Sequence, residues 1–317
     1  MVDYPRDAFA LAPSTSVFGL IGFSGDTNRE QAQLEFLQPL YSAYADDWWF
    51  LSVFAFALIE VGQAEKGKAL VEQALEKKPR SAHSAHIYAH ALYELGEDQR
   101  LASYLEQWLP QYSPELLLSC HLWWHLCLAK LMLGEHEDIW TLYDAHCAPG
   151  VSSSPAINVL TDGVSLLWRS ELAGQARQTD RWQALLDYQQ AVFRKPMVFV
   201  DAHGGLPYLA VGEENHFDQW MEALNKAVDD GKLPAGQVPV KLNLAFSAFE
   251  SGDWALAIEI LESVYDEVVR IGGSRAQRDL MRNTLIAAYI KNEQVDVARR
   301  FMRLESDRNP SVPVLGL

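Results

Sequence analysis

A glycine recurs along this chain after an apolar helical stretch and before an amphipathic one. Glycine adopts the left-handed backbone that ends many helices at no steric cost. The successive intervals are 34, 38, 40, 38 and 40 residues, and the glycines are Gly62, Gly96, Gly134, Gly174, Gly212 and Gly252. A period in this range is typical of solenoids built from helix pairs. The segments between the glycines are long and have an apolar period of 3.6 rather than 2, so the sequence predicts an all-α fold with almost no sheet.

The glycine positions divide the chain into expected helix pairs. We expect pairs at 47–62 with 64–77, 81–95 with 97–112, 114–133 with 135–147, 155–173 with 180–194, 198–211 with 214–230, 238–251 with 253–271, and 274–292 with 294–306. Ser274 and Gln277 are predicted to form a capping box. Before the pairs, we expect a helix over 28–44 that is kinked or broken at Pro39, and one helix with a Gly-rich connection within 1–27. Residues 1–46 are therefore assigned to an N-terminal helical segment, and 47–317 to a single domain of helical hairpins.

The unit from 46 to 79 has small residues where its two helices would meet. Gly67 and Ala74 fall five and twelve residues after Gly62, and Pro79 falls seventeen after it. Small side chains let helices approach closely, and a proline stops the second helix. The unit resembles a tetratricopeptide repeat, which implies a superhelix of stacked hairpins. Bulky residues replace the expected alanine in other units, where the pairs are expected to splay or shift: Leu101, Ile139 and Phe217.

Charge and cysteine content limit the classes of partner. The formal net charge is -16, and the sequence has no Lys/Arg run or basic stripe, which argues against binding nucleic acid. The three cysteines are odd in number and lie in or beside apolar helical stretches, which fits reduced thiols: Cys120, Cys127 and Cys147. No window has the length of a membrane span, and the first residues lack the pattern of a signal peptide. We therefore expect a cytoplasmic protein without a membrane partner, and a homodimer is compatible with the sequence.

Histidines are concentrated in the segment 80–146, which holds seven of the nine. Residues three, four and seven apart share a helix face, so His83, His86 and His90 form one stripe and His121 with His125 another. In tetratricopeptide repeats the first helix of each pair lines the concave groove, and both stripes are predicted to face it. Two repeated tripeptides could add carboxylates and further rings: Asp144-Ala-His146 and Asp201-Ala-His203.

Three interpretations of this histidine-rich surface remain open. The rings are structural groups or plain binding groups in a polar groove, acid/base catalysts in an enzyme pocket, or metal ligands. The HxxxH spacing places two imidazoles on one metal ion, and imidazole with carboxylate suits zinc, iron or manganese. The HExxH pattern and the pair of ExxH motifs of ferritin-type sites, both known from helical metal centres, do not occur. The tryptophans at 48, 49, 108, 123, 124 and 140 are expected in the core rather than as a stacking platform. Arg278 and Asp279 have the simpler interpretation of an ion pair at a helix start.

Several longer strings extend the resemblance beyond a generic repeat. They are DYPRDAFAL, CHLWWHLCL followed by IWTLYDAH, RWQALLDY, FVDAH and RIGGSRAQRDL. In this order they resemble the family of tetratricopeptide-repeat protein 38 and the bacterial StaR-like proteins. Members generally carry a further N-terminal portion, so the resemblance implies a shortened form here. It also implies a site lined by His86, His90, His121, Trp124, His125, Asp144, His146, Asp201, His203, Gln277, Arg278 and Asp279, with Arg6 and Asp7. StaR-like relatives occur with glycopeptide-antibiotic synthesis, for which hydroxylation of an amino-acid side chain has been suggested.

Two functional hypotheses follow. The first is a helical-repeat protein that binds a peptide or small molecule in a His/Trp-rich concave pocket. The second is an enzyme that uses the His/Asp cluster for acid/base or metal-dependent chemistry, and a divalent metal is the only cofactor considered. Its expected catalytic residues are His86, His121, His125, Asp144, Asp201 and His203, and the expected ligand-binding residues are His83, His90, Trp124, His146, Gln277, Arg278 and Asp279.

The two hypotheses differ in the expected shape of the concave side. An open groove favours binding, whereas a filled concavity with an enclosed pocket favours chemistry. For a shared site we expect at least four rings to converge, from His86, His90, His121, His125, His146 and His203. We also expect Asp144 or Asp201 to be hydrogen-bonded to one of these rings.

Overall fold

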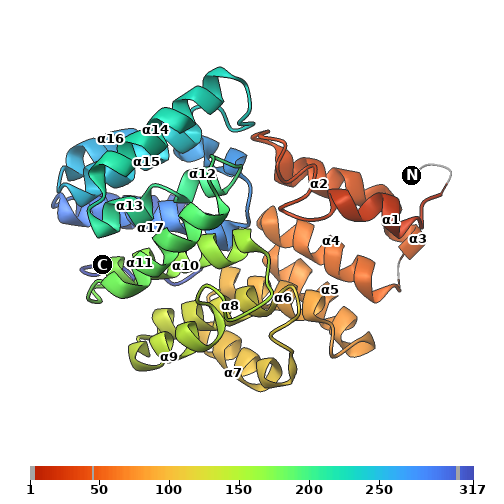
Figure 1. Ribbon diagram of the computed structural model, residues 1–317. Coiled ribbons are helices and arrows are strands. Elements are labelled where there is room, and N and C mark those ends of the chain that lie inside the picture. The colour runs from red at the N-terminus through yellow and green to blue at the C-terminus, as the bar shows by residue number, and fades with distance from the viewer. Residues whose placement is uncertain (1–3, 45, 305–307) are drawn as a thin grey trace.

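The computed structural model describes residues 4–44, 46–304 and 308–317, and this part of the chain is helical without a strand (Figure 1). The α-helices are α1 (Ala8–Leu11), α2 (Arg29–Leu37), α3 (Tyr41–Tyr44), α4 (Trp48–Glu60), α5 (Ala64–Lys77), α6 (Ala82–Glu94), α7 (Asp98–Trp108), α8 (Ser119–Leu133), α9 (His136–His146), α10 (Ala156–Leu172), α11 (Thr179–Val192), α12 (Val200–His203), α13 (Leu206–Val211), α14 (Glu214–Asp229), α15 (Val238–Glu250), α16 (Trp254–Val264), α17 (Arg275–Lys291) and α18 (Val295–Leu304). Short 3-10 helices are η1 (Ala12–Ser14), η2 (Gln38–Leu40), η3 (Leu109–Gln111) and η4 (Tyr265–Ile271).

The recurring glycines end helices as predicted. All six have a positive φ, between 69° at Gly96 and 88° at Gly174, which is the backbone region that favours glycine. The predicted capping box is also present, because the Ser274 side chain accepts from the Gln277 backbone and the Gln277 side chain accepts from the Ser274 backbone. Local signals in the sequence therefore predicted these seven helix ends.

Some predicted helices are shorter or broken. The helix expected over 198–211 is divided into α12 and α13 at Gly204 and Gly205, where a Cβ on Gly205 would lie 2.0 Å from Asn243 Oδ1. Pro39 lies in η2 between α2 and α3, so the helix expected over 28–44 is interrupted there. Helix α8 begins at Ser119, later than the expected residue 114. The helix expected to end at residue 271 stops at Val264 and is followed by η4. Within 1–27, where one helix was expected, the structure has the short helices α1 and η1. The last helix was expected to reach 306; α18 ends at Leu304, and residues 305 and 306 lie outside the described part.

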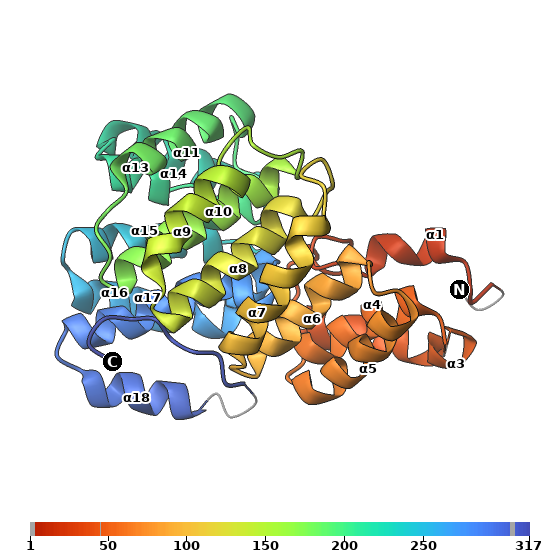
Figure 2. The same cartoon turned by 90° about the horizontal axis from the view of Figure 1, so that it is seen from below.

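Helices pack mainly against their neighbours in the sequence, but α17 also packs against α6 and α10 (Figures 1 and 2). The Tyr93 hydroxyl of α6 donates to Asp279 Oδ2 of α17 at 2.6 Å. Trp168 of α10 donates through Nε1 to the Thr284 hydroxyl of α17 at 2.9 Å. Helices 186 residues apart in sequence are thus joined in the interior, and α17 covers the side of α6 on which an open groove was expected.

The interior contains large aromatic side chains as well as polar ones. Of the tryptophans expected in the core, at 48, 49, 108, 123, 124 and 140, Trp124 is fully buried and the other five are partly buried. Trp168 and Trp182 are at most 1% exposed. The N-terminal segment packs on α4 through a second apolar cluster that includes Leu37 and Phe50. Among the described residues, none of the helices combines the length and the apolar character that crossing a membrane requires.

Candidate metal centre

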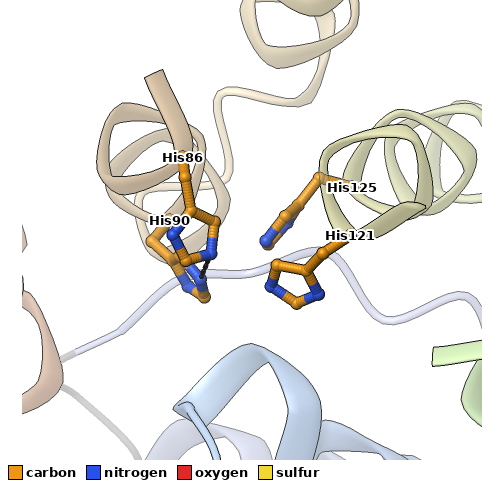
Figure 3. Close-up of side chains that lie close together, drawn as sticks. All are labelled: His86, His90, His121 and His125. Carbon is orange, nitrogen blue, oxygen red and sulfur yellow. Dashed lines mark hydrogen bonds between the residues drawn. The ribbon is translucent and has the colours of Figure 1, made fainter. Parts of the chain in front are cut away.

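Four histidine rings meet between α6 and α8 (Figure 3). His86 and His90 lie one turn apart on α6, and His121 and His125 lie one turn apart on α8. One ring nitrogen from each residue lies within 4.8 Å of those of the other three. The i, i+4 spacing gives each helix a pair of rings on one face, and the contact between α6 and α8 brings the two pairs together. We call these four residues the histidine cluster.

The cluster is buried and short of hydrogen-bond partners. His90, His121 and His125 are at most 4% exposed, and His86 is partly exposed. Both ring nitrogens of His125 and Nδ1 of His90 have no partner among the described residues. Among the described residues, one hydrogen bond joins two rings of the cluster, between Nε2 of His90 and Nε2 of His86 at 2.8 Å. Unpartnered buried polar atoms are costly, and a bound ion would relieve that cost.

Burial keeps three of the four rings neutral. It lowers the pKa of His86, His90 and His125 well below the ordinary value, and the neighbouring rings lower each pKa further because like charges would repel. Arg169 also lowers the pKa of His125. Neutral imidazole is the form that binds metal ions, so these three rings are held in their ligating state at neutral pH.

Asp162 of α10 supports the cluster from outside. Its Oδ2 lies 2.7 Å from His121 Nδ1, and its Oδ1 accepts from Gln277 Nε2 at 3.2 Å. A carboxylate on one ring nitrogen fixes the tautomer and leaves the other nitrogen's lone pair for a ligand, as in many metal sites. Asn158 is a further donor to Asp162 at 3.5 Å, and Trp124 stacks on the His121 ring at 5.1 Å.

The cluster fits a tetrahedral ion of the size of zinc after a small contraction. Metal–nitrogen bonds of 2.0–2.1 Å place tetrahedral ligand atoms about 3.3 Å apart. The separations here lie at or below 4.8 Å, so the widest pairs would close in. The Nε2 atoms of His86 and His90 are 2.8 Å apart and would move slightly apart. Imidazole suits zinc, copper, iron and nickel. All four rings would therefore hold the ion directly, while Asp162 would orient one of them.

Two residues expected in the site lie elsewhere, which corrects the prediction. Asp144 is on α9, where its carboxylate forms a two-bond ion pair with Arg181 at 2.9 and 2.6 Å and is 54% exposed. His146 stacks on Trp123 with ring centroids 3.7 Å apart. The physical reason is that α9 is the second helix of its pair, and both residues face outward from it, whereas the cluster lies on first helices.

Asp201 and His203 are not part of the histidine cluster. They lie on α12, which packs against α10, the helix that carries Asp162. His203 is buried, with Nδ1 2.7 Å from the Phe199 carbonyl oxygen. Burial lowers its pKa to about 4, while that bond and the charge of Asp162 raise it. Burial raises the pKa of Asp201 to about 8, against the backbone N–H groups that lower it. Neither carboxylate predicted to bond a ring does so; Asp162 has that contact instead.

The remaining predicted residues lie in several parts of the fold. His83 is one turn before His86 on α6, and burial lowers its pKa to about 4. Gln277 bonds Asp162, whereas Arg278 pairs with Glu30 and Asp279 pairs with Arg308. Arg6 and Asp7 are exposed; Arg6 donates to the Ala43 carbonyl oxygen and Asp7 caps α1.

Asp162 was missed although its sequence context carried a signal. Helix α10 is buried along its length, yet polar residues recur on it at spacings of three and four: Asn158, Asp162, Ser165 and Arg169. Polar groups on a buried helix need specific partners. Such a stripe therefore indicates a polar network inside the protein, and here it leads to His121 and to Tyr93.

No protein-family model matches this sequence.

Proposed function

We propose that this protein binds a divalent first-row transition metal through His86, His90, His121 and His125. The observation that carries the proposal is the convergence of four ring nitrogens within 4.8 Å in a buried site. Three supporting features are the lowered pKa values of His86, His90 and His125, the unpartnered nitrogens of His90 and His125, and the carboxylate on His121.

A metal-dependent enzyme is the functional class that this centre supports best. Neutral imidazoles would leave the ion its full positive charge. It would act as a Lewis acid or, if iron or copper, as a redox centre, provided that one coordination position is open to a substrate. His86 is the partly exposed ligand, so it marks the side from which a small molecule would approach. The side-chain hydroxylation implied by the resemblance to StaR-like proteins would need iron or another redox metal, and the identity of the bound metal therefore tests that specific activity.

The alternative of a peptide or small-molecule receptor with an open concave groove has less support. We propose that the helix pairs form a tetratricopeptide-like superhelix, because the six left-handed glycines recur at near-constant spacing. However, α17 contacts both α6 and α10, and the cluster is nearly closed to solvent. An enclosed polar centre favours chemistry over docking of an extended peptide.

Metal analysis of the purified protein tests the proposal directly. We expect about one equivalent of zinc, iron, copper or nickel per chain by inductively coupled plasma mass spectrometry. The double variant His121→Gln/His125→Gln is expected to bind less than a tenth of an equivalent, with circular dichroism that remains helical. The control is His216→Gln, which removes an exposed histidine paired with Glu213.

The outcomes separate a site from a structural role. Wild-type protein that takes up none of these ions after reconstitution would contradict the proposal. The same holds if the double variant retains the metal. A double variant that loses metal but melts within a few degrees of the metal-free wild type supports it, because the rings then matter for binding more than for the fold.

A further inference from the structure

A polar cavity, separate from the histidine cluster, lies among α2, α4, η4, α17 and the segment that begins at residue 308. Its volume is about 380 Å³, within the range of small-molecule sites. Four of the sixteen arginines line it, although the whole chain has a net charge of -16: Arg275, Arg278, Arg282 and Arg308. The acidic lining residues are Glu30, Glu60, Asp266 and Asp279. None of the cluster histidines lines this cavity, so it is a separate place in the fold.

The arginines form one wall because of their spacing on α17. Residues 275, 278 and 282 follow the i, i+3, i+7 pattern that places side chains on one helix face. Arg308 adds a fourth guanidinium from another segment. Planar guanidinium groups recognise carboxylates through paired hydrogen bonds, so this wall has the chemistry of an anion site.

These arginines also contact protein groups, and Arg275 Nε lies 3.7 Å from Glu94 Oε2. Arg278 pairs with Glu30 and also donates to the Gly273 carbonyl oxygen. Arg308 donates to both oxygens of Asp279 and to Glu94. Its Nε is buried without a partner among the described residues. Arg308 therefore keeps one donor that neither acidic residue uses.

Glu60 is the second observation that indicates a ligand. It is 3% exposed, lines the cavity from the end of α4, and its Oε1 has no hydrogen-bond partner among the described residues. Its Oε2 accepts from the Arg275 backbone N–H at 2.9 Å. One oxygen is thus fixed by the start of α17, and the other is buried and unsatisfied, a condition that a hydrogen-bonding ligand would relieve.

We propose that this cavity binds a small organic anion with two or more carboxylates, held by the arginines of α17 and by Arg308, with the unpartnered oxygen of Glu60 as a further contact. The proposal does not depend on the histidine cluster or on a bound metal. Glu60 and an incoming carboxylate would share one proton through the free oxygen. The arginine wall would bind the ligand's other carboxylate.

The charges around Glu60 determine how binding should depend on pH. Burial, Glu30 of α2 and Glu94 of α6 raise the pKa of Glu60, whereas Arg278 of α17 and Arg29 of α2 lower it. The net result is a pKa of about 7. An anion stabilises the protonated form of Glu60, whereas a cation stabilises the ionised form. Anion affinity should therefore rise as the pH falls from 8 to 6.

Calorimetric titration of the full chain with succinate, citrate and inorganic phosphate tests the proposal. We expect succinate and citrate to bind about tenfold more tightly at pH 6 than at pH 8, because one proton is taken up. In Glu60→Gln the amide can donate at either pH, so binding is retained and the pH dependence disappears. Arg275→Gln is expected to weaken both ligands at least tenfold. The control Arg300→Gln removes an exposed arginine of α18 and leaves binding unchanged.

The milder variant Arg282→Lys keeps the charge and removes the planar fork, so it tests the same wall if Arg275→Gln does not fold. It is expected to weaken binding severalfold. The proposal fails if wild-type protein binds neither carboxylate at millimolar concentration, or if affinity rises with pH. It also fails if phosphate binds more tightly than both carboxylates, or if no folded arginine variant of the wall loses affinity.

Discussion

Asp162 is the residue whose role in the proposed metal centre can be tested most sharply. It touches His121 at 2.7 Å and is not itself one of the four cluster residues. Loss of a carboxylate behind a ligating histidine typically costs 10–100-fold in metal affinity. We therefore expect Asp162→Asn to bind metal with an affinity lower by about that factor, measured by competition with a chromogenic chelator.

The control for Asp162→Asn is the same substitution at Asp201, another fully buried aspartate of the neighbourhood. The carboxyl oxygens of Asp201 make no hydrogen bond to a cluster ring or to another described side chain, so Asp201→Asn should leave the affinity within about twofold of wild type. Equal losses in the two variants would show that any buried carboxyl group near the site matters, and that the contact with His121 has no special role.

The buried rings also predict how the metal-free protein responds to acid. The folded-state pKa values of His86, His90 and His125 lie below the ordinary value of 6.5 because of burial and the neighbouring rings. The unfolded chain therefore binds more protons below about pH 6.5, and the free energy of unfolding must fall as pH falls through that range. Above pH 6.5 these rings add no pH dependence.

Each of these histidines can contribute a slope of up to about 1.4 kcal/mol per pH unit. Urea denaturation of metal-free protein at pH 7.5, 6.5, 5.5 and 5.0 measures the net slope of all titrating groups, and variants isolate the share of one ring. His125→Gln should show a shallower slope, whereas His216→Gln, at an exposed ring, should follow wild type. A slope for His125→Gln equal to that of wild type would mean that the His125 ring is not kept neutral by the fold.

At the scale of a helix pair, Gly67 decides how closely α4 and α5 pack. A Cβ at this position would lie 2.5 Å from Ile59 Cγ1 and 2.7 Å from the Ala55 carbonyl oxygen. Helix propensity alone predicts that Gly67→Ala stabilises by about 1 kcal/mol. Overpacking costs about 1–3 kcal/mol and should exceed that gain, so we expect net destabilisation in urea denaturation. Ala69→Gly, at an exposed position of the same helix, isolates the propensity effect; a stabilised Gly67→Ala would show that the two helices separate freely.

Local sequence signals predicted the elements well where one residue determines the backbone. Gly62 and Ser274 define helix ends through φ and capping, and such effects depend on residues within one turn. The division between α12 and α13 was not predictable in this way, because Asn243 on α15 is what presses against Gly205. The spacing of His86 and His90 predicted that the two rings share a face of α6. The carboxylate that contacts His121 belongs to Asp162 of α10, and no local pattern in the sequence specifies where α10 packs.

At the scale of the whole molecule, closure by α17 is the feature that the sequence left open. Periodic helix pairs predict neighbours that stack, and they do not predict that a helix late in the chain returns to α6. The return is made by polar contacts: Arg169 donates to the Tyr93 hydroxyl at 2.8 Å, and Tyr93 donates to Asp279. Burial opposes ionisation of Asp279, but Arg308, Arg282 and Arg169 outweigh it and lower its pKa to about 2. A charged network, rather than an apolar seam alone, therefore joins the early and late helices.

Arg308 links α6 and α17, so its removal should destabilise both helices at once. It bonds Asp279 of α17 and Glu94 of α6, and the next residue donates its backbone N–H to the Glu94 carbonyl oxygen at 2.8 Å. Arg308→Met keeps the volume and leaves two buried carboxylates with less compensation, so we expect a loss of about 3–5 kcal/mol in the free energy of unfolding. Arg300→Met, at an exposed site, should cost less than about 0.5 kcal/mol. Hydrogen exchange should quicken in α6 and α17 together, because the same side chain holds both; faster exchange in α17 alone would show that α6 does not depend on this closure.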